Sequence, residues 1–194
     1  MRFAAYNDDM NSISNPIRLS LTSEVPTHAE SMPKVAFKKD GTIIAAYEKK
    51  APTTKNKYAS AIYFVASTDG GKSWSEESFL HSDTVAGKNR SYFDIERLPD
   101  GEIGASWLDI KLNDETGGRS VRFAKTTPSN GFSNEVLVDS SACQCCRIDV
   151  YTDETENIFV AYRGLSKGQM GRQIRDMMIA TSTDQGTSFS KPVT

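Results

Sequence analysis

Three cysteines within one short segment could carry out chemistry. The segment reads Ala142-Cys143-Gln144-Cys145-Cys146-Arg147, and it contains every cysteine of the sequence. An odd set predicts a free thiol or a partner elsewhere, here beyond Thr194. Thiolates also bind soft metals, although the paired Cys-x₂-Cys spacing of structural zinc sites is missing. Three hypotheses therefore stay open: a disulfide to a cysteine outside this sequence, a soft-metal site of Cys143, Cys145 and Cys146, with or without His28, and free thiols.

The elements that would position these residues follow from a turn that occurs twice. Ser67-Thr68-Asp69-Gly70-Gly71-Lys72-Ser73-Trp74 is echoed by Ser182-Thr183-Asp184-Gln185-Gly186-Thr187-Ser188-Phe189. In this pattern the Asp can accept bonds from the amides of the turn, the Gly can take a positive φ, and the aromatic ring can pack back between the strands. Each copy follows a short apolar run, so we expect each to join two strands of a hairpin.

A second motif repeats in phase with this turn. Residues 40–47, 100–107 and 156–162 each read as a turn dipeptide followed by an alternating, β-rich strand. An apolar residue before each turn recurs about every 56–61 residues, close to the period of propeller blades. These residues are Phe3, Phe64, Phe123 and Ile179. No segment shows a long amphipathic helical pattern. The sequence therefore predicts an all-β chain in which a four-stranded unit repeats.

The pattern Ser-x-Asp-x-Gly-x-Thr/Ser-Trp/Phe resembles the Asp box, or BNR repeat, of sialidase-type β-propellers. The resemblance implies a single partial propeller domain over residues 1–194, with four-stranded blades at 28–82, 90–140 and 146–194. Residues 3–23 would supply strands 3 and 4 of a leading blade. Because propellers have about four to eight blades, we expect half of a six-bladed sialidase-like ring. Either the chain is a fragment and the remaining blades belong to the same protein, or a second copy completes the ring.

This topology separates two faces of the domain. The repeated turns lie at one face, whereas strand-1 starts, strand-2 ends and strand-3 starts meet at the other, where we expect any site. The charged residues at these positions include three candidate general acids, Asp94, Asp109 and Asp176. The candidate substrate-binding residues are Arg147, Arg163, Arg175, Glu30 and His28.

The resemblance also implies an activity. Sialidases bind the carboxylate of sialic acid with three arginines, and use a Tyr nucleophile with a Glu partner and an Asp acid/base. The first of these arginines lies in an Arg-Ile-Pro motif, and the corresponding stretch here reads Ser31-Met32-Pro33. Two functions follow: a sialidase-like glycoside hydrolase, an exo-alpha-sialidase in particular, or a non-catalytic glycan- or protein-binding propeller that has lost the arginine triad.

The third predicted blade carries a more particular resemblance. Residues 143–147, the run Val160-Ala161-Tyr162-Arg163 and residues 174–179 occur in the order found in a group of bacterial BNR-repeat, sialidase-like proteins with a Cys-x-Cys-Cys strand entry. These proteins are mostly exported, which implies a periplasmic or secreted location. A later cysteine in the following blade is typical of the group and implies a disulfide partner for the odd thiol.

Composition narrows the range of partners. The net charge is −2 and the isoelectric point is near 5.8, so there is no electrostatic case for nucleic acid. No apolar run approaches the roughly 18 residues that span a bilayer, and residues 1–25 lack the pattern of a signal peptide. We expect a glycan or glycoconjugate as the partner, and no cofactor.

Overall fold

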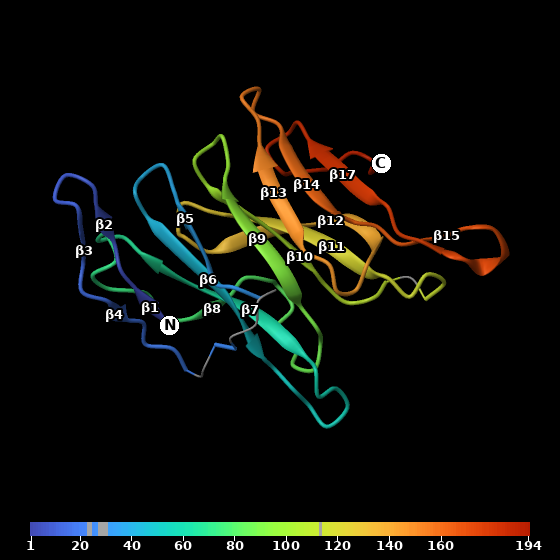
Figure 1. Cartoon of the computed structure of the whole chain (residues 1–194), viewed down its shortest axis with the longest axis horizontal. Coiled ribbons are helices and arrows are strands. Elements are labelled where there is room, and N and C mark those ends of the chain that lie inside the picture. Colours follow the sequence, from blue (N-terminus) through green and yellow to red (C-terminus); the bar gives the residue numbers. More distant parts are fainter. Residues whose placement is uncertain (23–24, 27–30, 113) are drawn as a thin grey trace.

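The structure is a computed structural model that describes residues 1–22, 25–26, 31–112 and 114–194. The prediction of an all-β chain is confirmed, because the described residues form strands with a single 3₁₀ turn, η1 (Gln169–Gly171). Two four-stranded antiparallel sheets and one three-stranded sheet follow each other along the chain (Figure 1).

Each sheet has its strands in chain order. The first sheet contains β5 (Lys34–Phe37), β6 (Ile43–Lys50), β7 (Ser60–Ser67) and β8 (Ser78–Phe79). The second contains β9 (Ser91–Arg97), β10 (Ile103–Leu108), β11 (Arg119–Thr126) and β12 (Phe132–Ala142). The third contains β13 (Ile148–Thr152), β14 (Ile158–Arg163) and β17 (Met177–Ser182), and Val193 pairs with Ile179 beside β17.

Three two-stranded pairs accompany these sheets. Near the N-terminus, β1 (Arg2–Phe3) pairs with β4 (Ile17–Arg18), and β2 (Tyr6–Asn7) pairs with β3 (Ser12–Ile13). The pair of β15 (Ser166–Lys167) and β16 (Gln173–Ile174) extends from the third sheet near the C-terminus (Figure 1).

The sheets pack against each other through apolar faces. Ile44 and Phe64 of the first sheet lie in one core cluster with Phe93 and Trp107 of the second. A second cluster joins the second and third sheets through residues such as Phe123 and Val160. Burying a side chain of this size contributes about 1.5–3 kcal/mol. These contacts bring the first strands together, and β9 lies between β5 and β13 (Figure 1).

One fully buried aromatic residue occupies the same position in the second strand of each sheet. These residues are Tyr47, Trp107 and Tyr162. Each donates a hydrogen bond to a carboxylate, at 2.7, 2.8 and 2.6 Å for Glu77, Asp109 and Asp139, respectively. A buried hydroxyl or indole N–H needs such a partner. The repeat therefore gives the second strand of each sheet a buried aromatic residue whose polar atom has a carboxylate partner.

The two copies of the repeated turn share one hydrogen-bonding pattern. Asp69 accepts bonds from the Ser73 amide at 2.9 Å and the Ser73 hydroxyl at 2.6 Å, and Asp184 accepts the same two from Ser188 at the same distances. These bonds hold the pKa of both carboxyls near 2. The hydroxyl of the first Ser in each copy also accepts the amide of the glycine two residues after the Asp.

The aromatic residue of each turn contacts the neighbouring strands. Trp74 packs edge-on against Phe3, with the ring centroids 5.3 Å apart, and Phe189 packs edge-on against Phe123 at 5.0 Å. Both turns begin where β7 and β17 end, at the opposite end of their sheets from the first residues of β5 and β13. The turns thus stabilise the packing and lie away from the first-strand starts.

Candidate functional site

A charged residue lies at the same level of the first strand in all three sheets. These residues are Lys34, Asp94 and Asp149, and their antiparallel partners are Ala46, Ser106 and Ala161. The partners occupy equivalent positions, each one residue before the buried aromatic residue of its second strand. Because β9 lies between β5 and β13, this level of the repeat gathers one cation and two carboxyls.

Asp94 connects the three first strands. Its Oδ1 accepts a bond from Lys34 Nζ at 2.7 Å, and its Oδ2 accepts the amide of Val150 on β13 at 3.0 Å. Asp94 is 7% exposed, whereas the Lys34 side chain keeps 41% of its surface in solvent. The carboxylate is thus held in place from both neighbouring sheets.

Asp149 is the exposed member of this group. Its pKa is raised from 3.8, first because the surrounding strands remove part of its hydration, and then by a hydrogen bond with Asp94 and the negative charge of that residue. Lys34 acts in the opposite direction. Two neighbouring carboxyls whose environments differ in this way are suited to hold one proton between them. The exposed Asp149 can therefore act as a proton donor beside the ion-paired Asp94.

A strained residue lies next to this group. The pairing of β9 with β10 shifts between Ser106 and Leu108, which adds one residue to β9 and places Tyr92 at a φ of 55°. A non-glycine residue in this region costs about 1–3 kcal/mol, and such bulges are frequent beside active sites.

The Tyr92 amide bonds to the carboxyl of Glu48, near the end of β6. Burial raises the pKa of Glu48, and the Ser31 hydroxyl donates to its Oε2 at 2.9 Å.

Asp109, one of the predicted general acids, is engaged by buried neighbours. It is 4% exposed, and its Oδ2 accepts Trp107 Nε1 at 2.8 Å and Arg90 Nε at 3.1 Å. The other oxygen accepts the Ile110 amide at 2.6 Å. These contacts give Asp109 an anchoring function at the end of β10. A catalytic role for it stays a prediction that no contact supports.

Arg119 stabilises the same corner. It is 4% exposed and donates to the carbonyls of Asp109 at 2.8 Å, Leu108 at 2.5 Å and Asn89 at 2.5 Å. Burial lowers its pKa to about 10, which leaves the guanidinium charged at neutral pH. This arginine fixes the loops around the starts of β9 and β11.

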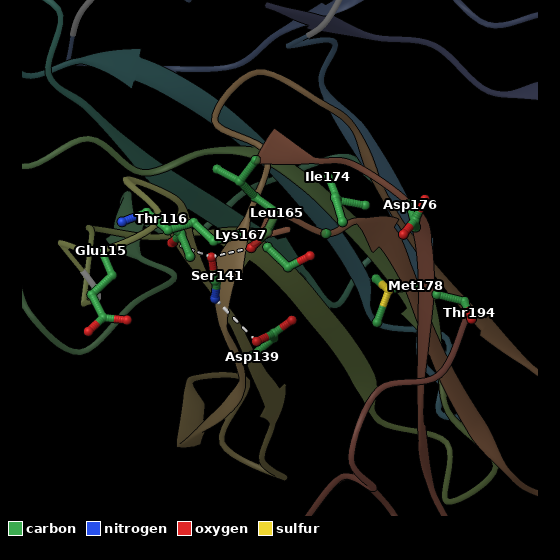
Figure 2. A pocket seen from close by; sticks show the side chains of 12 residues that line it. Glu115, Thr116, Asp139, Ser141, Leu165, Lys167, Ile174, Asp176, Met178 and Thr194 are labelled. Atoms are coloured by element: carbon green, nitrogen blue, oxygen red, sulfur yellow. Dashed lines mark hydrogen bonds between the residues drawn. The ribbon is translucent and has the colours of Figure 1, made fainter. Parts of the chain in front are cut away.

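Asp176, another predicted acid, lies in a separate cavity of about 480 Å³ between the end of β12 and the third sheet (Figure 2). On its other side the Ser141 hydroxyl bonds to Thr116 Oγ1 and to the Leu165 carbonyl, both at 2.6 Å. The cavity is lined by Glu115, Thr116, Asp139, Ser141, Gly164, Leu165, Ser166, Lys167, Ile174, Asp176, Met178 and Thr194. Asp94 and Asp109 do not line this cavity, so the three predicted acids belong to three different surroundings.

Two predicted arginines lie beside the cysteines. Arg163 Nη1 is 4.0 Å from Cys146 Sγ, and the charge of Arg175 acts on Cys143. Arg147 is exposed at the entry to β13. His28 and Glu30 fall outside the described residues. A substrate-binding role for these five residues stays a prediction.

The sequence interpretation missed Lys34, Tyr92 and Asp149. An alignment of the three repeats could have found two of them, because Pro33-Lys34-Val35, Phe93-Asp94-Ile95 and Ile148-Asp149-Val150 occupy matching places. The strained Tyr92 has no such signal, because its neighbours in sequence resemble an ordinary strand.

Solved structures of carbohydrate-active enzymes share this arrangement of sheets. The Hadza microbial sialidase Hz136 superposes with a TM-score of 0.58 at 14% identity, over 82% of this chain and 36% of its own. An α-L-arabinofuranosidase from Fusarium graminearum gives 0.53 at 18% identity, over 84% of this chain and 47% of its own. The polysaccharide lyase Uly1 gives 0.53 at 12% identity, over 83% and 39%.

These similarities establish the fold. The chain has the architecture of part of a β-propeller, as predicted, and it spans between about a third and three fifths of the length of the solved chains that it matches. No protein-family model and no curated protein sequence matches it. Among the described residues, no helix is long and apolar enough to cross a membrane.

Proposed function

We propose that this chain belongs to a sialidase-like glycoside hydrolase, and that Asp149 is its general acid. The observation that carries the proposal is the group of Lys34, Asp94 and Asp149 on three adjacent first strands, where an exposed carboxyl with a raised pKa lies beside a buried, ion-paired one. The fold similarity to a sialidase, an arabinofuranosidase and a polysaccharide lyase supports a glycan as the substrate.

The chemistry assigned to Asp149 is proton transfer. Its carboxyl donates a proton to the glycosidic oxygen while the bond from that oxygen to the anomeric carbon breaks, and water later supplies the hydroxyl at that carbon and returns a proton. Carboxyls that act as a glycosidase pair lie at least about 5 Å apart. Asp94 is hydrogen-bonded to Asp149 and is therefore too close for that role. Asp94 instead acts as a positioning residue that holds the proton on Asp149.

Sialic acid is the sugar that the sequence resemblance favours. Arg147, Arg163 and Arg175 would bind its carboxylate in this proposal, since a guanidinium binds a carboxylate with two parallel hydrogen bonds. Arg163 and Arg175 come from the third sheet, at the end of β14 and just before β17. Replacing either arginine should weaken the binding of sialosides and leave uncharged glycosides unaffected.

A panel of fluorogenic α-sialosides, α-L-arabinofuranosides and other glycosides tests the proposal. We expect turnover of at least one substrate, and a loss of about 10²–10⁴-fold in Asp149→Asn. Asp9→Asn is a matched control, because Asp9 is an exposed carboxylate in the turn between β2 and β3, and it should retain full activity. Undiminished turnover in Asp149→Asn would refute the assignment of the acid.

The second candidate function is glycan binding without catalysis. The absence of an arginine in Ser31-Met32-Pro33 favours it. Binding on a glycan array with no turnover of any substrate in the panel would establish this function and exclude the first. Measurable hydrolysis would exclude it.

A further inference from the structure

The three thiols of the chain converge in the connection between β12 and β13. Cys143 Sγ lies 3.0 Å from Cys146 Sγ and 4.0 Å from Cys145 Sγ. All three sulfur atoms are within 4.8 Å of one another, and none is in a disulfide. Cys143 is buried, Cys146 is half-buried and Cys145 is exposed. One short segment thus directs three soft donor atoms to a common point that solvent can reach.

The backbone holds this segment on both sides. The Cys143 amide donates to the Arg163 carbonyl at 2.7 Å, and Ala142 pairs with Gly164. Gln144 Nε2 donates to the Gly117 carbonyl at 2.5 Å, while Arg119 Nη1 donates to the Gln144 carbonyl at 3.4 Å. The sulfur positions are therefore prepared by the fold, and little conformational entropy remains to be lost when a ligand binds.

The surroundings shift the pKa values of Cys143 and Cys146 in opposite directions. Burial opposes ionisation, yet hydrogen bonds from Cys146 and Cys145 and the charge of Arg175 lower the pKa of Cys143. Burial and the bond to Cys143 raise the pKa of Cys146 to about 11. Arg163 and Arg175 supply positive charge that would offset the excess negative charge of several thiolates around one ion.

We propose that Cys143, Cys145 and Cys146 form a three-sulfur binding site for a thiophilic ion, namely Cu(I). Thiolate sulfur selects such soft ions, and Cu(I) accepts trigonal sulfur coordination. Structural Zn²⁺ takes four ligands, and no fourth His, Cys, Asp or Glu joins this group within the described residues.

With metal–sulfur distances near 2.3 Å, three sulfurs around one ion lie about 4 Å apart. The present spacing needs only small side-chain rotations to reach this. Each thiol that binds releases its proton to solvent.

Titration of the anaerobically reduced protein with Cu(I), in competition with the chelator bicinchoninate, tests the site. We expect one Cu(I) for each chain, with an ultraviolet thiolate-to-copper band, and copper–sulfur distances from three sulfurs in X-ray absorption. Cys145→Ser, the exposed ligand, should lower the affinity by roughly tenfold or more, since even residues outside the ligand set change metal affinity by about 10–100-fold. Ser140→Ala, on β12 beside the segment, is the control and should bind as the wild type does.

The X-ray absorption spectrum keeps the proposal testable even where a cysteine variant fails to fold, because it needs only the wild-type protein. Substoichiometric copper, unchanged affinity in a folded Cys145→Ser protein, or nitrogen and oxygen neighbours in the spectrum would overturn the assignment. So would a disulfide that persists after reduction. These readouts do not involve glycan turnover, so this proposal and the proposed function can fail separately.

Discussion

The ion pair between Lys34 and Asp94 should contribute measurably to stability. At 2.7 Å the attraction between the two charges is roughly 1.5 kcal/mol in a water-like dielectric and roughly 6 kcal/mol at an effective value of about 20. The Lys34 side chain is 41% exposed, so water screens the pair and the lower figure applies. We therefore expect a coupling energy of about 1–1.5 kcal/mol between the two side chains.

A double-mutant cycle measures this coupling. The free energy of unfolding in urea is determined for the wild type, Lys34→Met, Asp94→Asn and the double variant, and Lys55→Met serves as the control for removing an exposed lysine. High salt should reduce the coupling, since screening acts on the exposed lysine. Additive effects, with a coupling below about 0.5 kcal/mol, would refute the claim that Lys34 holds Asp94.

Three further predictions concern pH and packing. Because the folded state raises the pKa of Asp149 above 3.8, its contribution to stability is fully present below that value and is lost as the pH rises through the raised pKa. Asp149→Asn should therefore exceed the wild type in urea unfolding at neutral pH, and a deficit there would contradict the shift. Burial, followed by the charge of Arg90, lowers the pKa of His81 to about 4 from 6.5. The stability that neutral His81 contributes is thus complete above 6.5 and is lost as the pH falls through about 4; an equally steep decline in His81→Gln would contradict this. Gly186→Ala should cost about 1–3 kcal/mol, because Gly186 has a φ of 81° and a Cβ there would lie 2.4 Å from the Phe123 ring. Gly131→Ala, with no atom within 4 Å, should change thermal unfolding little, and equal losses would refute the steric argument.

The repeated motifs predicted most of the fold. Turn, strand and aromatic plug are local features with a fixed period, and the strands that end at Ser67 and Ser182 lie where the motif places them. The hydrogen bonds of Asp69 and Asp184 also follow from the turn alone. Local chemistry of this kind can be recognised in a sequence because it involves neighbours only a few residues apart.

The candidate site was harder to predict, because its contacts join residues that are distant in sequence. Asp94 meets Lys34 across 60 residues and the Val150 amide across 56, so the group depends on how the sheets pack. The sequence selected Asp94 from its strand position but had no means to find its pairing with Asp149. It also could not show that buried partners engage Asp109.

In the mechanism that we propose, Asp149 donates the proton, and Asp94 and Lys34 shift its pKa in opposite directions. The pH dependence of hydrolysis of the best substrate in the glycoside panel tests this most directly, in the wild type, Asp94→Asn and Lys34→Met. Removal of the negative charge at Asp94 should lower the pKa of Asp149 and move the alkaline limb of the profile to lower pH, whereas removal of Lys34 should move it to higher pH. An alkaline limb that stays in place in both variants, or moves the same way in both, would contradict the account.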